Sequence, residues 1–345
     1  MIMRRTVFAL ASAAMMIVLN LHAEQLFPTA TIAQSRDSLR RARVDSVLTA
    51  RYYQTSYDTA YVARPEGRLT LKARLNQSGN DIHARGTVNG VESRADLRTS
   101  HKTTLSVAAI YRGISAGFAI NPAKMGGFYK DYEMNLNYYS ARLSLDASYQ
   151  RSTTLAGDIK RGDIDSRLES DDIKMKVLNV AGYYIFNHRQ FSYAAAFTQS
   201  YIQRRSAGSW LAGFSYQGGS IKTTDALLSR NPNAPDSRIY VGHFGIGGGY
   251  GYNWVLGKKW MLHFSMMPSL VVFNRNNMTV NGERRKAQHT RFNMLFNERA
   301  AIVRNFSSRY FAGITLTMNN SVFDDDVVVI NQNKWRARAF FGLRL

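Results

Sequence analysis

Apolar and polar side chains alternate over the last eleven residues of the chain, WRARAFFGLRL. The odd positions from Trp335 to Leu345 are all apolar, whereas Arg336, Arg338 and Arg344 occupy even positions. Successive side chains of a β-strand point to opposite faces of the sheet, so a period of two predicts a strand with one apolar and one polar face.

The same period recurs along most of the chain. It begins with Leu69, Leu71, Ala73 and Leu75, which alternate with Thr70, Lys72, Arg74 and Asn76. Further runs cover residues 105–111, 114–120, 132–138, 143–149, 210–216, 244–254, 260–266 and 310–318. Short strands at such regular spacing predict an all-β sandwich or an all-β barrel.

The connections between these runs alternate in length. Tight turns are expected near residues 112–113, 140–141, 187–189, 257–258 and 305–308. Longer polar connections are expected at 78–101, 152–171, 218–237, 274–288 and 319–333. A transmembrane β-barrel has this asymmetry, with short turns on the periplasmic side and longer loops outside the cell.

Aromatic residues lie towards the strand ends on the apolar face. They are Tyr111, Tyr132, Tyr138, Tyr149, Tyr252, Trp254, Trp260 and Tyr310. Tyr and Trp favour the boundary between membrane and water, and barrels carry two such girdles. A sandwich also buries one face of each strand, so the girdles and strands of about ten residues favour the barrel. The arginines of the last strand are then expected to face the lumen.

The N-terminus carries the features of an export signal. Arg4 and Arg5 precede an uncharged apolar run from Val7 to Leu19, and Ala23 offers a small residue for cleavage. This pattern predicts a cleaved signal peptide over residues 1–23. No later segment holds 18 consecutive apolar residues, so no membrane-spanning helix is predicted. The expected location is the outer membrane of a Gram-negative bacterium.

The remaining chain divides into two parts. Residues 24–66 form a periplasmic segment, in which 34–53 have helical spacing of apolar residues and predict a short amphipathic helix. Residues 67–345 form the barrel. About thirteen runs are visible, but a single-chain bacterial barrel needs an even number, so we predict about twelve strands, with ten or fourteen as alternatives. The doubtful stretch is 171–237, where the alternation loses phase at Leu178 and suggests a bulge or a second strand.

Four stretches of the chain resemble a known family. They are YDTAYVARPEGRLTLKARLNQSG, NPAKMGGFYKDYEMNLNYYS, SAGSWLAGFSYQGG and GYGYNWVLGKKW. These are similar to blocks of the Bacteroidota outer-membrane proteins called domain of unknown function 4421. The resemblance covers nearly all of the mature chain. It implies a signal peptide, a β-barrel and an outer-membrane location, and it brings no catalytic residues. Barrels often end on an aromatic residue, and this chain ends on Leu345.

The chain is strongly basic, with 45 Lys and Arg against 24 Asp and Glu and a formal charge of +21. Inward-facing cations are expected to line the lumen at Lys72, Arg74, Lys174, Lys176, Arg336, Arg338 and Arg344. First and last strands are neighbours in a closed barrel, so their cations would form one stripe that attracts small anionic solutes. The alternative is that these cations pair with Glu133, Asp146 or a plug and merely fill the interior.

Cations in loops have a second potential partner. The basic loop from Asn281 to Ala287 suits the phosphates of outer-membrane lipid and lipopolysaccharide. Nucleic acid is not an expected partner, because the positive charges are spread over the strands and loops of an exported protein.

Glycines occupy one face of the run from Phe244 to Trp254, at Gly245, Gly247, Gly249 and Gly251. On a lumen face, such a stripe leaves room for another segment to approach the wall, and the helix at 34–53 is the candidate plug. The alternative is that the glycines relieve crowding where the barrel curves sharply.

No catalytic residue, metal site or cofactor is predicted. The chain has no Cys, and no His, Asp and Glu cluster has metal-binding spacing. His263 and Ser265 share a lumen face, but the sequence shows no orienting partner for them. We therefore expect a passive function: a narrow channel, or a structural barrel that stabilises the membrane or binds surface glycolipid. The alternative is a barrel enzyme that acts on outer-membrane lipids.

Overall fold

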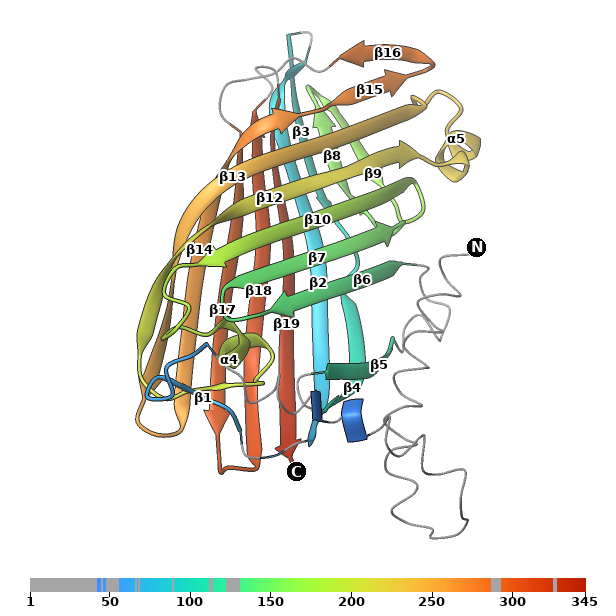
Figure 1. The fold of residues 1–345 in the computed structure, drawn as a ribbon. Helices are drawn as coiled ribbons and strands as arrows, with labels where there is room; N and C mark the ends of the chain where they lie inside the picture. The colour runs from blue at the N-terminus through green and yellow to red at the C-terminus, as the bar shows by residue number, and fades with distance from the viewer. Residues whose placement is uncertain are drawn as a thin grey trace.

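The structure is a computed structural model that describes residues 42–44, 46–47, 56–65, 67, 69–88, 90–111, 114–121, 131–286, 293–324 and 328–345. One large antiparallel sheet curls into a barrel (Figure 1). The predicted signal peptide and most of the predicted helix at 34–53 lie outside the described residues. Positions 42–44 and 46–47 are helical. Within the described ranges, no helix is long and apolar enough to cross a membrane.

The wall strands pair in one continuous series, β6, β7, β10, β12, β13, β14, β17, β18, β19, β2, β4 and β5. β6 and β5, at the two ends of this series, are consecutive in the chain. The prediction of an antiparallel β-barrel of about twelve strands is therefore confirmed. The wall strands span Leu69–Val88 (β2), Lys102–Tyr111 (β4), Ile114–Ile120 (β5), Tyr132–Tyr139 (β6), Leu143–Ser152 (β7), Ile173–Ile185 (β10), Ala207–Thr223 (β12), Ser237–Leu256 (β13), Trp260–Asn274 (β14), Met294–Asn305 (β17), Tyr310–Asp324 (β18) and Val328–Arg344 (β19).

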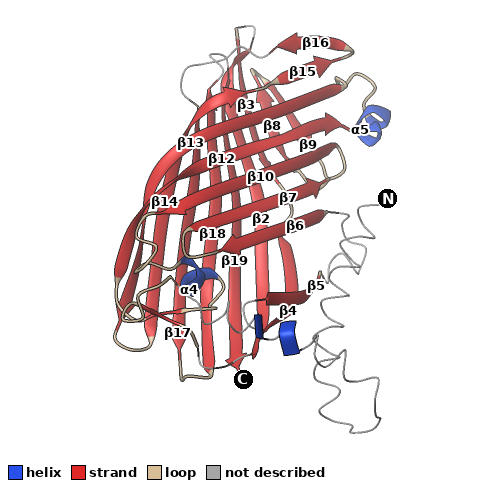
Figure 2. Cartoon of the chain, in the orientation of Figure 1, coloured by secondary structure: helices blue, strands red, loops and turns tan. Residues whose placement is uncertain are grey.

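Shorter elements extend the wall or fold inside it. β3 (Val91–Arg98), β8 (Ala156–Arg161) and β9 (Ile164–Leu168) continue the sheet beyond the barrel, as do β15 (Asn277–Val280) and β16 (Glu283–Lys286). β1 (Val62–Ala63) and β11 (Ile202–Gln203) form a separate two-stranded ladder. The short helices α4 (Tyr193–Phe197) and α5 (Asp225–Arg230) lie towards opposite ends of the barrel (Figure 2).

The two ends of the barrel differ in their connections. Leu69 and Leu345 exchange backbone hydrogen bonds of 3.1 and 2.7 Å, so both chain-terminal wall strands meet at one end. The tight connections 140–142, 257–259 and 306–309 lie at this short-turn end, whereas β3, β8, β9, β15 and β16 extend from the long-connection end (Figure 1).

Apolar side chains cover the outside of the wall and polar ones line the inside. On β18, Ile314 is 55% exposed whereas its neighbour Thr315 is only 4% exposed. On the last strand, Phe341 is half exposed whereas Arg344 is buried. An oily exterior around a polar interior is the arrangement of a barrel that spans a membrane.

β10 explains why the alternation loses phase near Leu178. Its registers with β7 and β12 are unbroken, so Ile173–Ile185 is one regular strand with neither a bulge nor a break at Leu178. Its odd residues face inward throughout. Near the long-connection end the inward residues Met175 and Val177 are apolar and pack in a buried cluster with Ile82, Leu97 and Leu155. Leu178 instead faces outward and is exposed.

Candidate functional site in the barrel interior

The basic stripe of the first and last strands lies on the inner wall. β19 pairs with β2, and their register sets Arg336 opposite Ser78 and Arg338 opposite Asn76. Even-numbered residues of both strands face inward, with Lys72 only 2% and Arg344 only 3% exposed. Of the predicted lumen cations, the structure thus brings five together: Lys72, Arg74, Arg336, Arg338 and Arg344.

The prediction that Lys174 and Lys176 line the lumen is wrong. Lys176 is exposed, and it alternates with the buried residues Met175 and Val177. The reason is the apolar cluster inside this end of the barrel, which turns the apolar face of β10 inward. Both lysines consequently lie on the outer face of the wall.

Several stripe cations are held by neutral partners. Lys72 Nζ donates to Gln199 Oε1 at 2.7 Å and also to the carbonyl of Thr198. Arg338 Nε donates to Asn76 Oδ1 at 2.7 Å. The guanidinium of Arg344 lies 4.3 Å from the ring centre of Phe311. These contacts hold the three side chains in place against the inner wall.

Glu133 on β6 faces inward and contacts side chains of β2 and β4. Its Oε2 accepts a hydrogen bond of 2.8 Å from Ser78 and lies 3.7 Å from Lys102 Nζ. Nearby, Lys334 Nζ on β19 donates to Ser148 Oγ on β7 at 3.0 Å. Side chains from non-adjacent strands therefore meet across the interior.

Arg299 on β17 makes the most extensive of these cross-lumen contacts. Its Nη2 lies 2.7 Å from Asp146 Oδ2 and donates to the Tyr183 hydroxyl at 2.7 Å. Its Nη1 donates to the Tyr139 hydroxyl at 3.2 Å, and that hydroxyl donates to Asp146 Oδ1 at 2.6 Å. The guanidinium and the carboxylate thus form a buried ion pair, in which each charge offsets part of the cost of burying the other.

A small cavity of about 30 Å³ lies between these groups, with Glu133, Asp146, Arg299, Lys334 and Arg336 in its lining. A water molecule needs roughly 10–15 Å³ of such space, so this cavity holds only a few waters. Closer to the long-connection end, Gln217 Nε2 donates to Gln332 Oε1 at 2.6 Å and Gln332 Nε2 donates to Asn80 Oδ1 at 3.1 Å.

The short-turn end is closed by residues 186–206, which we call the internal segment. It leaves the wall after β10, folds into the barrel as α4 and returns to the wall at β12. Ser192 caps α4, with its hydroxyl accepting from the Ala195 N–H at 3.2 Å. All five residues of α4 are buried. The sequence predicted only a tight turn at 187–189, because the run FSYAAAF has no period of two.

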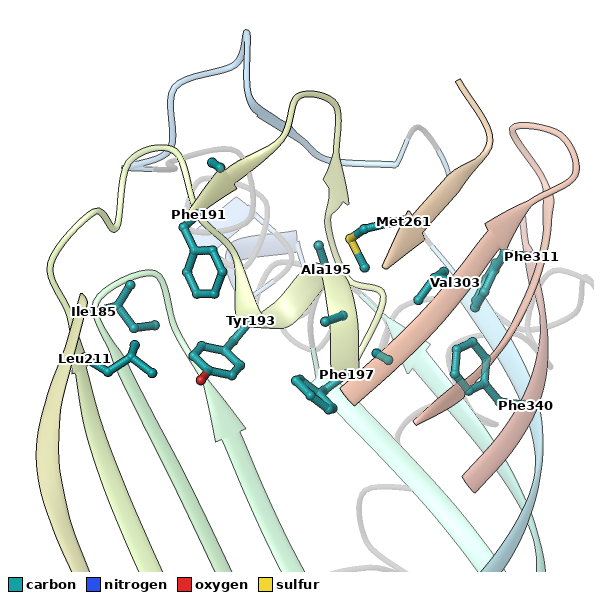
Figure 3. Packing of buried hydrophobic residues seen from close by; sticks show 13 residues of the cluster. Ile185, Phe191, Tyr193, Ala195, Phe197, Leu211, Met261, Val303, Phe311 and Phe340 are labelled. Carbon is teal, nitrogen blue, oxygen red and sulfur yellow. The ribbon is translucent and has the colours of Figure 1, made fainter. Parts of the chain in front are cut away.

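Aromatic rings anchor the internal segment to the wall, as Figure 3 shows for the buried cluster around Phe191, Tyr193 and Phe197. The Tyr193 ring lies 6.2 Å from both Tyr139 and Tyr183, measured between ring centres. Wall residues Phe311 and Phe340 belong to the same cluster. The lumen at this end is therefore occupied by a packed apolar core.

A chain of hydrogen bonds beside α4 links Asn253, His263 and Ser265. His263 Nδ1 lies 2.7 Å from Asn253 Oδ1, and His263 Nε2 lies 3.0 Å from Ser265 Oγ. Because Asn253 Oδ1 only accepts, Nδ1 carries the proton and Nε2 accepts from the serine hydroxyl. This order of nucleophile, base and orienting group resembles the triad of serine hydrolases, with the neutral amide of Asn253 in the place of their carboxylate. The sequence alone does not identify Asn253 as the orienting residue, because only the strand register places it opposite His263.

The same residues also hold the internal segment in place. Asn253 Nδ2 donates to the Ser192 carbonyl at 3.1 Å and to Gln203 Oε1 at 2.9 Å. The His263 ring centre lies 5.1 Å from that of Tyr193. All three members of the chain are buried, so Ser265 is closed to a substrate in this structure.

The glycine stripe faces inward on β13 and serves two purposes. A Cβ on Gly247 or Gly249 would lie 2.0 Å from a backbone oxygen of β14, at Pro268 or Met266. These glycines therefore permit a close approach of two wall strands, as the crowding alternative proposed. A Cβ on Gly251 would lie 3.0 Å from the Phe191 ring. The segment beside the stripe is thus the internal segment, while the predicted plug at 34–53 lies mostly outside the described residues.

The predicted interface aromatics lie on the outer face near the strand ends. Tyr138, Trp254, Trp260 and Tyr310 are exposed near the short-turn end, with Tyr252 partly exposed beside them. Tyr132 and Tyr149 face outward closer to the long-connection end. The side chain of Tyr111 lies outside the described part. Among the described residues, no group of three or more His, Asp or Glu is placed to hold a metal ion.

The sequence matches the model of one protein family, described as a domain of unknown function (DUF4421), over residues 56–344. No curated protein matches the sequence significantly.

Solved structures with a similar course of the chain are membrane proteins. The outer membrane protease OmpT from Escherichia coli is 9% identical, with a TM-score of 0.39 over 81% of this chain and 97% of that one. The outer membrane protein OprG from Pseudomonas aeruginosa is 10% identical, with a TM-score of 0.29 over 85% and 99% of the two chains. The toluene transporter TodX from P. putida is 8% identical, with a TM-score of 0.26 over 81% and 91%. At these identities nothing about activity is transferred.

Proposed function

Because the chain belongs to the family described as a domain of unknown function, DUF4421, we propose its function from the geometry of its own barrel: a structural outer-membrane barrel with a closed lumen and no catalytic activity. Its partners are outer-membrane lipid and lipopolysaccharide. A cleaved signal peptide at residues 1–23 and an origin in the Bacteroidota are part of the same proposal.

The orientation follows from the connections. Barrels place short turns in the periplasm and long loops outside the cell. The short-turn end, where Leu69 and Leu345 meet, is then periplasmic, and the extensions formed by β3, β8, β9, β15 and β16 face the cell exterior.

The observation that carries the closed lumen is contact between opposite walls along its length. The internal segment fills the short-turn end, Arg299 and Lys334 reach across the middle, and Met175 packs with Ile82 and Leu97 at the other end. A solute-conducting barrel instead needs a water-filled path. The cations of the lumen accordingly serve to fill it.

Planar bilayers test the closed lumen. Full-length protein inserted into a bilayer should give no steady unit conductance, while heat modifiability and protease protection in proteoliposomes show that it has inserted. Steady openings of the inserted wild-type protein would contradict the proposal.

Such openings would instead favour a narrow channel for small anionic solutes. Its charge preference would then come from Arg336 and Arg338, and the double variant Arg336→Glu, Arg338→Glu should reverse the ion preference. If the openings of that variant kept the wild-type selectivity, the basic stripe would not be what determines the selectivity.

A lipid hydrolase is the second candidate, and the chain Asn253, His263 and Ser265 favours it. Such an enzyme would label with a fluorophosphonate and turn over labelled phospholipid, and Ser265→Ala would abolish both. Absence of labelling in inserted, folded protein would eliminate this candidate.

A further inference from the structure

Four cations lie side by side on the outer face of three neighbouring strands. Arg151 on β7 is directly opposite Lys176 on β10, and Lys174 on β10 is directly opposite Lys222 on β12. Arg151 and Lys176 are exposed, and Lys174 and Lys222 are partly exposed. We call Arg151, Lys174, Lys176 and Lys222 the outer basic patch.

Nothing in the described part of the chain neutralises this patch, since none of its four side chains forms an ion pair there. Two of the three acids of the connection before β10 are already engaged, because Arg230 binds Asp172 at 2.6 Å and Glu169 at 2.9 Å, and the third, Asp171, forms no ion pair with the patch in the described part. Like charges directly opposite each other destabilise a pair of strands. Because Lys222 is also directly opposite Arg238 on β13, the wall places three such pairs together, and an external anion would stabilise them.

The position of the patch along the barrel indicates where that anion lies. Lys174 and Lys176 stand at the beginning of β10, at the long-connection end. Towards the other end the same outer face continues with the exposed residues Leu178 and Phe214 and with the partly exposed Tyr149. Leu178 and Tyr149 lie directly opposite each other, and the cations follow, so apolar and aromatic side chains followed by cations match the order of hydrocarbon, interface and head group in a membrane leaflet.

The spread of the patch indicates more than one phosphate. Adjacent strands are about 4.8 Å apart, so β7 and β12 are separated by roughly 10 Å across β10. Two rows of cations over this width fit two phosphates better than one.

We propose that the outer basic patch binds the phosphates of an acylated sugar diphosphate, a glycolipid of the outer leaflet, whose acyl chains lie against the wall beside Leu178 and Phe214. This inference rests on the outer-membrane location in the proposed function. It assigns a site to the lipid partner on the wall itself, separate from the basic loop at 281–287.

The test uses full-length protein in detergent micelles, titrated with bisphosphorylated lipid A and followed by native mass spectrometry. The double variant Lys174→Gln, Lys176→Gln should weaken binding by roughly tenfold to thirtyfold. The matched control is Lys258→Gln, Lys259→Gln, which removes two exposed cations at the opposite end and should leave the affinity unchanged. Phosphatidylethanolamine should bind more weakly than lipid A and equally to both variants.

Each other outcome overturns the inference. Equal lipid A affinity in both double variants would exclude the patch as the site. Displacement of lipid A by an equal concentration of inorganic phosphate would show a site for free phosphate. Insertion is measured separately in proteoliposomes: failure to insert contradicts the proposed function, whereas insertion without an effect of the variants contradicts only the lipid site.

Discussion

Arg299 joins four strands from inside the lumen, through Asp146, Tyr139 and Tyr183. Removing it leaves Asp146 buried without its cation, so Arg299→Met should lower the free energy of unfolding by about 3–5 kcal/mol. Urea unfolding of protein refolded into lipid vesicles measures this loss. Arg309→Gln, in an exposed turn, is the control and should change stability by less than about 0.5 kcal/mol.

The double variant Arg299→Met, Asp146→Asn removes both charges. It should be less destabilised than the sum of the two single variants, because the second change removes the unpaired charge that the first one leaves. Additive losses would show that the two groups do not depend on each other.

Asp96 lies on β3, and it makes the stability of the extension formed by β3 and β8 depend on pH. Hydrogen bonds from His83 and Arg94 hold the pKa of the Asp96 carboxyl below its ordinary value. A lowered pKa stabilises the folded state above the ordinary pKa of Asp, about 3.9, and this contribution is lost as the pH falls through the folded value. Amide hydrogen exchange of β3 should therefore show protection that decreases on acidification.

The variant Asp96→Asn isolates this effect. Its β3 amides should have lower protection at neutral pH, and that protection should not fall further as the carboxyl range is crossed. A wild-type protein whose β3 protection is constant down to pH 3 would refute the assignment.

Single residues show where reasoning from the sequence holds and where it does not. The inward direction of Lys72 and Arg338 follows from alternation alone, because their strand neighbours are apolar and face lipid. The same reasoning placed Lys174 and Lys176 inside, since it equated apolar with outward. That equation fails where an apolar cluster fills the lumen, and no local pattern around Met175 reveals such a cluster.

At the scale of elements, the glycine stripe of β13 sets how closely β14 approaches. Gly247→Ala and Gly249→Ala place a methyl group 2.0 Å from backbone oxygens of β14, which the wall accommodates only by moving. Each should destabilise the barrel by about 1–3 kcal/mol, the usual cost of overpacking. Gly248→Ala is the matched control, because its nearest neighbour lies at an ordinary 3.5 Å. Urea unfolding that ranks all three variants equally would refute the close approach.

The elements differ in how far the sequence predicts them. Wall strands such as β13, β14 and β18 follow directly from period two, because each has one face in lipid and one in a polar lumen. The internal segment does not, because residues buried on all sides have no periodicity. Its run FSYAAAF is a short apolar stretch, and only the closed barrel shows that it lies inside the wall.

At the scale of the whole molecule, the filled lumen depends on contacts between distant parts of the chain. Lys334 meets Ser148 across 186 residues, and Arg299 meets Tyr183 across 116. From the sequence, Glu133 and Asp146 are expected partners of lumen cations. The sequence does not show which cation each of them contacts. Choosing between an open and a filled lumen therefore required the three-dimensional register of all the wall strands.

Both the closed barrel and the lipid site depend on which face of the wall meets hydrocarbon. The chain has no Cys, so single cysteines introduced at Ile314, Thr315, Leu316 and Thr317 carry a spin label without background. In proteoliposomes, labels at 314 and 316 should be accessible to oxygen dissolved in the bilayer, while labels at 315 and 317 should be shielded from it. An accessibility without this alternation, or one with the opposite phase, would contradict the arrangement of an apolar outer face around a polar, filled interior.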